Sequence, residues 1–377
     1  RAIGTPDEGK TSWAEGDELL LVIDNTSYGS HSATFTYNGK SWELTSGELV
    51  YREGDPAYIP HVYYAPNYKW ANTSLMLKKG KAAGTDELIE GNAIITGNGE
   101  TITVSFAEAT RKYSRLRIAT LPNEQITVDT EYFTPAGSSD MEQKGNYTLT
   151  SDEKGNAYLY GTFENNSEVT VKYREAALTT HTFSQATESA KSYALDATVI
   201  SANSAEEIKS AIKQKVADGK TTIRLNLAPN AGTDEFMAIR EAIKGAAPND
   251  EGTIELTIIG VETIPEEAFK RMSQLKSVKM PDVKEIKKYA FSECQYLTVV
   301  EAPSLNKLNC GAFNECYLLS KLTFGPINYA DARYWPIFKD ITPNIDLILS
   351  DYQKEMIETD DNLYTANNDI DYALSNE

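Results

Sequence analysis

The chain has 377 residues with 55 acidic and 36 basic side chains, and its formal net charge is −19 at pH 7. This length suffices for two or three domains that each bury a core of their own. The acidity excludes nucleic acid as a partner, because a phosphate backbone is bound by a basic surface, and it disfavours an anionic membrane surface for the same reason. No apolar run approaches the ~18 residues that span a bilayer. We therefore expect any membrane attachment to depend on an N-terminal anchor lost before Arg1.

The N-terminal half has the patterns of β-structure. Residues 19–23 form a short apolar run, and segments 33–37 and 42–44 alternate between apolar and polar side chains on either side of Asn38-Gly39. Asn-Gly between two alternating segments predicts a β-hairpin, because both turn residues need positive φ. Further alternating segments lie at 102–106, 116–118, 169–173 and 193–197. Many short strands separated by turn signals predict antiparallel β-sandwiches.

The pattern changes near residue 200, where helical signals begin. Glu207 follows Ser204 at the spacing of a capping box, and apolar residues recur at helical spacing over 208–216. An alternating strand is expected at 223–227, and a second helix over 234–244. Strand, helix and strand in this order indicate parallel pairing.

The most informative feature is a period of 22 residues in the C-terminal half, in which seven apolar columns keep register over three units. The columns comprise Ile264, Ile286 and Leu308; Ala268, Ala290 and Ala312; Phe269, Phe291 and Phe313; Met272, Cys294 and Cys316; Leu275, Leu297 and Leu319; Leu256, Val278, Val300 and Leu322; and Ile258, Met280, Ala302 and Phe324. The period predicts a solenoid whose short strands stack into a parallel sheet. One unit cannot bury its apolar face alone, so a charge at Val300 is expected to unfold the array.

Residues 250–326 resemble the BspA-like, Treponema-type bacterial leucine-rich repeat. The motif Ile-x-x-x-Ala-Phe-x-x-Cys-x-x-Leu-x-x-Val-x-Ile-Pro is matched by Ile286, Ala290, Phe291, Cys294, Leu297, Val300 and Ala302-Pro303. Met272 replaces the cysteine in one unit, and Gly325 replaces the proline in another. The helices before the repeats and the segment 345–357 after them resemble caps. The resemblance implies surface display and binding, and it implies no chemistry.

The N-terminal half resembles the fimbrillin-like proteins of Bacteroides-type bacteria. The segments that match are Trp13-Ala-Glu-Gly-Asp17, Tyr37-Asn-Gly-Lys-Ser-Trp42, Val62-Tyr-Tyr-Ala-Pro66, residues 110–118 and Ala190-Lys-Ser-Tyr193. The resemblance implies two transthyretin-like sandwiches in tandem, which part near residue 120. Stalk fimbrillins donate a strand to the next subunit, whereas this chain continues into the repeats. We therefore expect an accessory, tip or stand-alone adhesin.

The three cysteines lie within 23 residues of one another. Cys294 and Cys316 share a column, so neighbouring coils could bring them close to disulfide distance. The alternative, which we favour, is that they are small buried packing groups. Cys310 lies off the column and is expected to be partly exposed.

No catalytic or metal-binding pattern is present in the sequence. His31, His61 and His181 are far apart and share no metal-ligand or triad spacing. Nucleophile-elbow, zinc-protease, phosphate-loop and dinucleotide motifs are missing. We expect that the protein is not an enzyme and has no catalytic residue, cofactor or metal. An enzyme with an unrecognised site is the weakest hypothesis.

Two further segments leave alternatives open. Residues 58–70 hold Tyr58, Tyr63, Tyr64, Tyr68 and Trp70. Such rings can stack on sugars, although a core strand with a tyrosine-rich flank is the simpler interpretation. The segment 358–371 is rich in Asp and Asn but lacks the order of a calcium loop, so a solvated cap loop is expected.

These inferences combine into a multidomain chain. We expect all-β, transthyretin-like sandwiches at 1–120 and 121–198, and a capped α/β leucine-rich-repeat solenoid at 199–377. The expected function is a non-enzymatic cell-surface adhesin or fimbria-associated protein, exported to the outer membrane or cell surface. Its partners would be surface proteins of a host or of other bacteria, with fimbrial subunits as a further candidate. The exposed positions Lys276, Lys279 and Glu301 would carry specificity. The alternative is a glycan-binding outer-membrane lipoprotein of a nutrient-uptake system.

Overall fold

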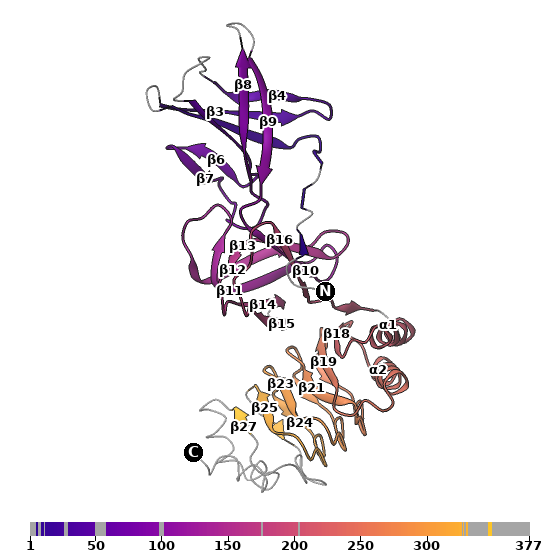
Figure 1. The fold of residues 1–377 in the computed structure, drawn as a ribbon. Coiled ribbons are helices and arrows are strands. Elements are labelled where there is room, and N and C mark those ends of the chain that lie inside the picture. Colours follow the sequence, from indigo (N-terminus) through magenta and orange to yellow (C-terminus); the bar gives the residue numbers. More distant parts are fainter. Residues whose placement is uncertain are drawn as a thin grey trace. The chain divides into compact units, whose positions relative to one another are not determined.

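The computed structural model describes residues 5–6, 9–10, 12–25, 29–49, 58–97, 102–174, 176–202, 204–325, 327, 329–330 and 346–348. The chain forms two compact units, Arg1–Ala197 and Thr198–Glu377 (Figure 1). The change from alternating to helical sequence patterns near residue 200 lies close to this division. The acidic segment 358–371 lies outside the described residues.

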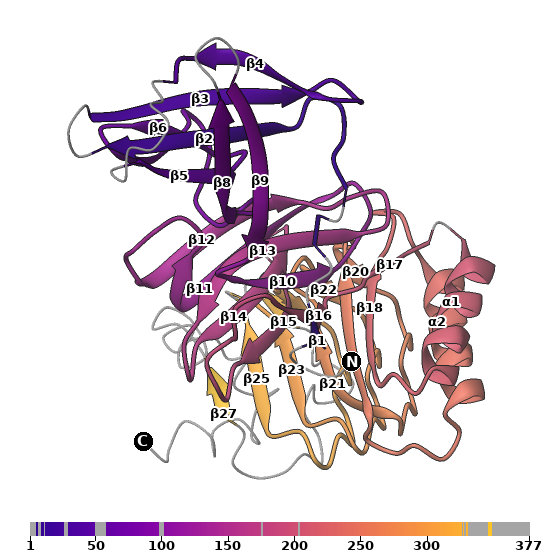
Figure 2. The ribbon, with the colours of Figure 1, turned by 45° about the horizontal axis from the view of Figure 1, so that its top comes forward.

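The first sheet of unit 1 is antiparallel and has six strands in the order β4-β3-β2-β5-β8-β9 (Figures 1 and 2). The strands are β2 (Glu18–Asn25), β3 (Gly29–Tyr37), β4 (Trp42–Gly47), β5 (Tyr58–Tyr64), β8 (Ile89–Gly97) and β9 (Ile102–Thr110). Strand alternation places one apolar set on a shared face, where it forms a core. That core contains Leu19, Leu21, Ile23, Val62, Ala93 and Ile95.

The hairpin predicted around Asn38-Gly39 is confirmed, although its turn differs from the expected one. Strands β3 and β4 pair antiparallel, with Tyr37 opposite Trp42, so four residues rather than two form the connection. Gly39 has φ +90°, whereas Asn38 has no positive φ. The Asn38 side chain instead accepts hydrogen bonds from the backbone N–H groups of Lys40 and Ser41, at 3.0 and 2.8 Å. An Asn side chain that satisfies turn amides in this way stabilises the longer loop.

A second hairpin of unit 1 follows β5 in the chain. It consists of β6 (Tyr68–Ala71) and β7 (Ser74–Leu77), joined by Asn72 and Thr73. Both turn residues have positive φ, 51° and 61°, which is the geometry of a two-residue type I′ turn. The hairpin lies on the side of the first sheet opposite its core, where the Trp70 Nε1–H donates to Ser30 Oγ at 2.9 Å.

The second sheet of unit 1 has eight strands. They are β1 (Thr5–Pro6), β10 (Ser114–Ala119), β11 (Gln125–Pro135), β12 (Glu142–Thr150), β13 (Asn156–Phe163), β14 (Glu168–Tyr173), β15 (Ala176–Thr182) and β16 (Lys191–Asp196). Their order is β1-β16-β10-β13-β11-β14-β15, with β12 paired to β11. Strand β10 lies before the division that we expected near residue 120, yet it belongs to this second sheet. It does so because Leu116 and Ile118 are buried there, in parallel register with Tyr193 and Leu195 of β16.

Unit 2 begins with alternating strands and helices, as the sequence predicts. The elements are β17 (Ile200–Ser201), α1 (Ala205–Ala217), β18 (Thr222–Asn226), α2 (Thr233–Ala246) and β19 (Ile254–Ile259). The predicted start of α1 is confirmed, because Ser204 Oγ accepts a hydrogen bond from the backbone N–H of Glu207 at 3.3 Å. The predicted parallel pairing is also confirmed, with Leu225 opposite Ile258.

The repeats continue the parallel sheet of β17, β18 and β19 (Figure 2). Their strands are β21 (Leu275–Lys279), β23 (Val299–Ala302), β25 (Lys321–Phe324) and β27 (Asp346–Ile348). A smaller parallel sheet contains β20 (Thr263–Ile264), β22 (Glu285–Ile286), β24 (Lys307–Leu308) and β26 (Tyr329–Ala330). We call residues 254–324 the repeat array. Strand β27 lies in the segment 345–357, which we expected to form a C-terminal cap. The other residues of that segment lie outside the described residues.

The predicted register of the repeat array is confirmed. Val278 pairs with Val300, and Val300 pairs with Leu322, so one step of 22 residues moves one strand along the sheet. The phenylalanine column is fully buried and stacked: Phe291 lies 5.2 Å from Phe269 and 5.4 Å from Phe313 between ring centroids. An eighth column, beyond the seven expected from the sequence, is also buried and contains Val261, Val283, Leu305 and Ile327. One core therefore runs through all the repeats.

Candidate binding surfaces

The outward side of the repeat array carries the three residues that we expected to confer specificity. Lys276 and Lys279 lie on β21, and Glu301 lies on β23. The structure brings two of them together, because Lys279 Nζ lies 3.0 Å from a Glu301 carboxylate oxygen. Lys276 pairs instead with Glu255 on β19, at 2.8 Å. All three charges thus have partners within the array.

Ion pairs between neighbouring repeats recur elsewhere on the array. They are Lys284 with Glu262 at 2.6 Å, Lys307 with Glu285 at 3.0 Å, and Arg271 with Glu293 at 2.7 Å. These pairs were not expected from the sequence, although basic residues and glutamates 22 positions apart were the available signal. Exposed pairs of this kind contribute only about 0–1 kcal/mol each. They leave the surface polar and locally neutral without setting the stability of the array.

The outward columns of the sheet differ in composition from the inward ones. Inward positions keep an apolar side chain in each repeat, as in the fully buried column of Val278, Val300 and Leu322. The neighbouring outward columns contain Glu255, Ser277, Val299 and Lys321, and Thr257, Lys279, Glu301 and Thr323; of these eight side chains Thr257 alone is buried. A constant interior with a variable exterior is the arrangement by which repeat proteins present a binding surface.

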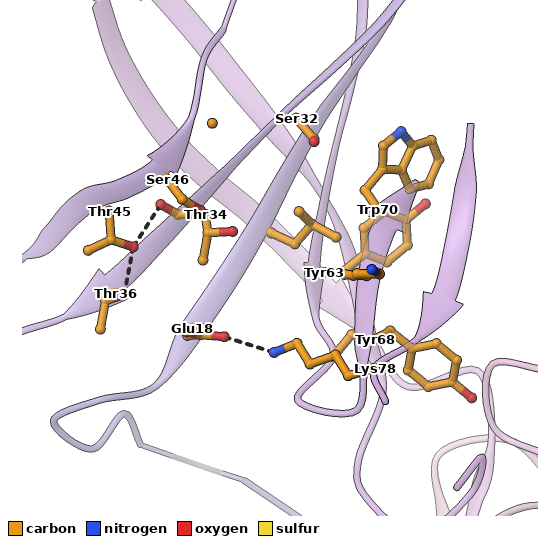
Figure 3. A pocket seen from close by; sticks show the side chains of 14 residues that line it. Glu18, Ser32, Thr34, Thr36, Thr45, Ser46, Tyr63, Tyr68, Trp70 and Lys78 are labelled. Carbon is orange, nitrogen blue, oxygen red and sulfur yellow. Dashed lines mark hydrogen bonds and ion pairs between the residues drawn. The ribbon is translucent and has the colours of Figure 1, made fainter. Parts of the chain in front are cut away.

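A second candidate surface is a cleft of about 550 Å³ in unit 1, between the outer face of the first sheet and the β6–β7 hairpin (Figure 3). One wall carries hydroxyl groups from β3 and β4. The hydroxyl-bearing residues are Ser32, Thr34, Thr36, Thr45 and Ser46. The other wall is aromatic, with Tyr63 of β5 and Trp70 of β6 nearly parallel at 21° and 6.2 Å apart between centroids. We call this feature the hydroxyl–aromatic cleft.

The structure divides the aromatic residues of segment 58–70 between the two faces of the sheet. Tyr63, Tyr68 and Trp70 line the cleft. Tyr68 is buried there, and its hydroxyl donates to the Ala136 carbonyl at 2.6 Å. Tyr64 points away from the cleft and packs against Trp13, with centroids 5.5 Å apart. The side chain of Tyr58 lies outside the described residues.

The cysteines are free thiols, and all three are buried. The thiols of Cys294 and Cys316 donate to the Phe269 and Phe291 carbonyls at 3.0 and 3.1 Å. Burial raises the pKa of the Cys294 thiol to about 12 and also raises that of Cys316. The expectation that Cys310 is partly exposed is wrong: it is 1 % exposed, because its turn is covered by the preceding coil, whose Tyr289 N–H donates to the Cys310 carbonyl.

Comparison with known families gives one match. Residues 253–334 match the family model described as the BspA type leucine rich repeat region, in six copies. These residues form a BspA-type leucine-rich-repeat region. The match covers the whole repeat array, continues ten residues beyond it and does not extend to unit 1. No curated protein and no solved structure matches the chain significantly. The likeness of unit 1 to fimbrillin-like proteins therefore stays a prediction, while the BspA-type repeats belong to a class that is typical of surface adhesion and protein binding.

The histidines lie on three different strands, as their spacing in the sequence suggested. His31 lies on β3, His61 on β5 and His181 on β15. His61 stacks beside Tyr63 at 28°, and His181 contacts Phe183 edge-on. In the part of the chain that the structure describes, no three His, Cys, Asp or Glu side chains are grouped closely enough to hold a metal ion. Nor does any helix of the described ranges have the length and apolar character needed to cross a membrane.

Proposed function

We propose that this chain is a non-enzymatic cell-surface adhesin that binds surface proteins of a host or of other bacteria through its BspA-type repeats. The observation that carries the proposal is the contrast between the constant inward columns and the variable outward columns of the sheet. The apolar core fixes the backbone, so outward side chains such as Lys279 and Glu301 are presented at set spacings without cost to folding.

The proposal also covers the architecture and the cellular location of the chain. The BspA-type repeats form a capped solenoid, and unit 1 consists of transthyretin-like sandwiches of the fimbrillin-like kind. The protein is exported to the outer membrane or cell surface, where unit 1 supports the solenoid. Fimbrial subunits are further candidate partners. The sequence likenesses support this part of the proposal, together with the mainly antiparallel strand pairing of unit 1.

The test measures binding of the fluorescently labelled full chain to epithelial and bacterial cells by flow cytometry. The decisive variant is Lys279→Ala/Glu301→Ala, which removes one charge of each sign and leaves the net charge unchanged. We expect it to weaken binding, because both side chains would contact the partner. Trypsin treatment of the target cells is expected to abolish binding of the wild type, since the partner is a protein.

Two ion pairs provide matched controls for this experiment. Arg271→Ala/Glu293→Ala removes a pair on the turn segments of the same repeats, outside the sheet. Lys144→Ala/Glu131→Ala removes an exposed pair between β11 and β12 of unit 1. Both are expected to leave binding unchanged. Two results would rule out protein recognition by the outward face. They are cell binding that survives trypsin treatment, and cell binding that is equally strong in all three double variants.

The alternative function is that of a glycan-binding outer-membrane lipoprotein in a nutrient-uptake system. One specific observation favours it, namely the presence of aromatic rings opposite hydroxyl groups in the cleft of unit 1. Binding that is destroyed by periodate oxidation of cell-surface glycans, and not by trypsin, would support this alternative over the adhesin.

A further inference from the structure

The hydroxyl–aromatic cleft combines two kinds of wall that suit one class of ligand. Its volume of about 550 Å³ lies within the range of about 300–1,000 Å³ that is usual for small-molecule sites. We propose that this cleft binds a sugar ring of an oligosaccharide. The proposal goes beyond protein binding by the repeats and does not depend on it, because the cleft lies wholly within unit 1.

The aromatic wall is fixed before any ligand arrives. Trp70 is held by the hydrogen bond from its Nε1–H to Ser30 Oγ at 2.9 Å, and the tight turn at Asn72 and Thr73 sets the position of its strand. Tyr63 stands on the neighbouring β5 with its ring nearly parallel to the indole. Both side chains are half-buried, so each still presents part of its ring. Rings of this kind offer a flat apolar face with a polar edge, which suits the C–H face of a pyranose.

The opposite wall follows from the sequence of β3. Alternate residues of a strand point to the same face, and Ser30, Ser32, Thr34 and Thr36 all carry hydroxyl groups on the face opposite the core. Within the described ranges, the hydroxyls of Ser32 and Thr34 on β3 and of Ser46 on β4 make no side-chain hydrogen bond. Each hydroxyl both donates and accepts, as the hydroxyls of a sugar do.

The charges of the cleft argue against other ligands of the same size. At one end Lys78 pairs with Glu18 at 3.0 Å, so its charge is already compensated (Figure 3). No arginine and no helix terminus lines the cleft, and its second cation, Lys69, is a single ammonium without the bidentate donors that suit a phosphate. A purely apolar ligand would cover the hydroxyl wall without satisfying it, which costs free energy for each buried hydroxyl. A polyhydroxylated ring with one apolar face satisfies both walls.

The test titrates the full chain with defined oligosaccharides. The neutral probes are cellohexaose, maltohexaose, mannohexaose, xylohexaose and chitohexaose, and the acidic probes are trigalacturonate and sialyllactose. Binding is measured by isothermal titration calorimetry and by the ¹H–¹⁵N signals of the indole groups, with that of Trp70 assigned from Trp70→Phe. We expect saturable binding of at least one probe, accompanied by a shift of the Trp70 signal.

Two variants and two controls then locate the site. Trp70→Ala should weaken binding about tenfold or more through lost stacking area. Thr34→Val, which keeps the shape of the side chain and removes its hydroxyl, should weaken binding about three- to tenfold. The controls on the second sheet are Tyr158→Ala, whose ring stacks on Tyr160 at 29°, and Thr148→Val, and neither should change affinity.

Three outcomes would overturn the proposal. They are the absence of saturable binding to every probe, binding that leaves the Trp70 signal unmoved, and affinity that is equal in wild type and Thr34→Val. The last variant keeps the proposal testable even if Trp70→Ala fails to fold. Because these probes contain no protein, their failure would leave the trypsin-sensitive adhesion proposed for the repeats untouched.

Discussion

Replacing Phe291 by alanine tests the central packing element of the repeat array. Its ring is fully buried and lies between Phe269 and Phe313, at 5.2 and 5.4 Å. Removing such a ring costs about 3–5 kcal/mol, because the apolar transfer energy is lost and the cavity relaxes only partly. The loss falls on two interfaces at once, since each repeat packs only on its neighbours.

The three cysteines make this destabilisation measurable within the array itself. All of them lie in the repeats and are buried, and burial raises the pKa of the Cys294 thiol to about 12. A thiol in this state reacts only after the array opens, so its labelling rate follows the population of the open form. A change of about 3–5 kcal/mol corresponds to an increase of about two to four orders of magnitude in the rate of reaction with Ellman's reagent in native buffer.

The control for this measurement is Tyr317→Ala, which truncates an aromatic side chain of the same array that is 45 % exposed. We expect its thiols to label at the wild-type rate. An increase of less than tenfold in Phe291→Ala, with circular dichroism unchanged from wild type, would refute the view that the phenylalanine column holds the repeats together.

Three further predictions address other elements. Val300→Asp places a charge in a fully buried column, and we expect the thiols of the array to react without denaturant, as a colorimetric thiol count would reveal. Ser204→Ala removes the acceptor of the Glu207 N–H at the start of α1 and should cost about 1 kcal/mol in urea denaturation; no change would mean that water replaces the cap. A hydrogen bond from Lys172 lowers the pKa of Asp129 in the folded state, so its contribution to stability is present above the unfolded pKa of about 3.9 and is lost as pH falls through the lower folded pKa. Wild type should therefore lose more stability than Asp129→Asn below about pH 4 in acid titrations followed by circular dichroism, and parallel curves would contradict this assignment.

The repeats were predictable because their period is long, exact and free of insertions. Once Val278, Val300 and Leu322 are aligned 22 residues apart, their strand register follows directly. The start of α1 was predictable for a similar reason, since Ser204 and Glu207 are a local signal that needs no tertiary context. A local capping signal and a strict repeat period therefore predict the folded structure without knowledge of distant contacts.

The parts that could not be predicted depend on contacts between distant segments. The two-residue strand β1 pairs with β16, almost the whole length of unit 1 away, and no local pattern marks it. The β6–β7 hairpin turns at Asn72 and Thr73, where the usual glycine is absent. The alternating hydroxyls of β3 were visible in the sequence, but only the fold places them opposite Trp70. Cys310 was misjudged because its burial comes from a neighbouring coil.

The bond from each column thiol to a phenylalanine carbonyl gives the stack a polarity. Cys316 donates backward to Phe291 and Cys294 donates backward to Phe269, whereas Met272 occupies the same column in the first coil, which follows α2. A thioether has no S–H hydrogen to donate to a carbonyl, so methionine suits this column only in the first coil. An array lengthened by duplication should therefore contain additional copies of a cysteine-bearing coil. A methionine in that column identifies the first coil of the array.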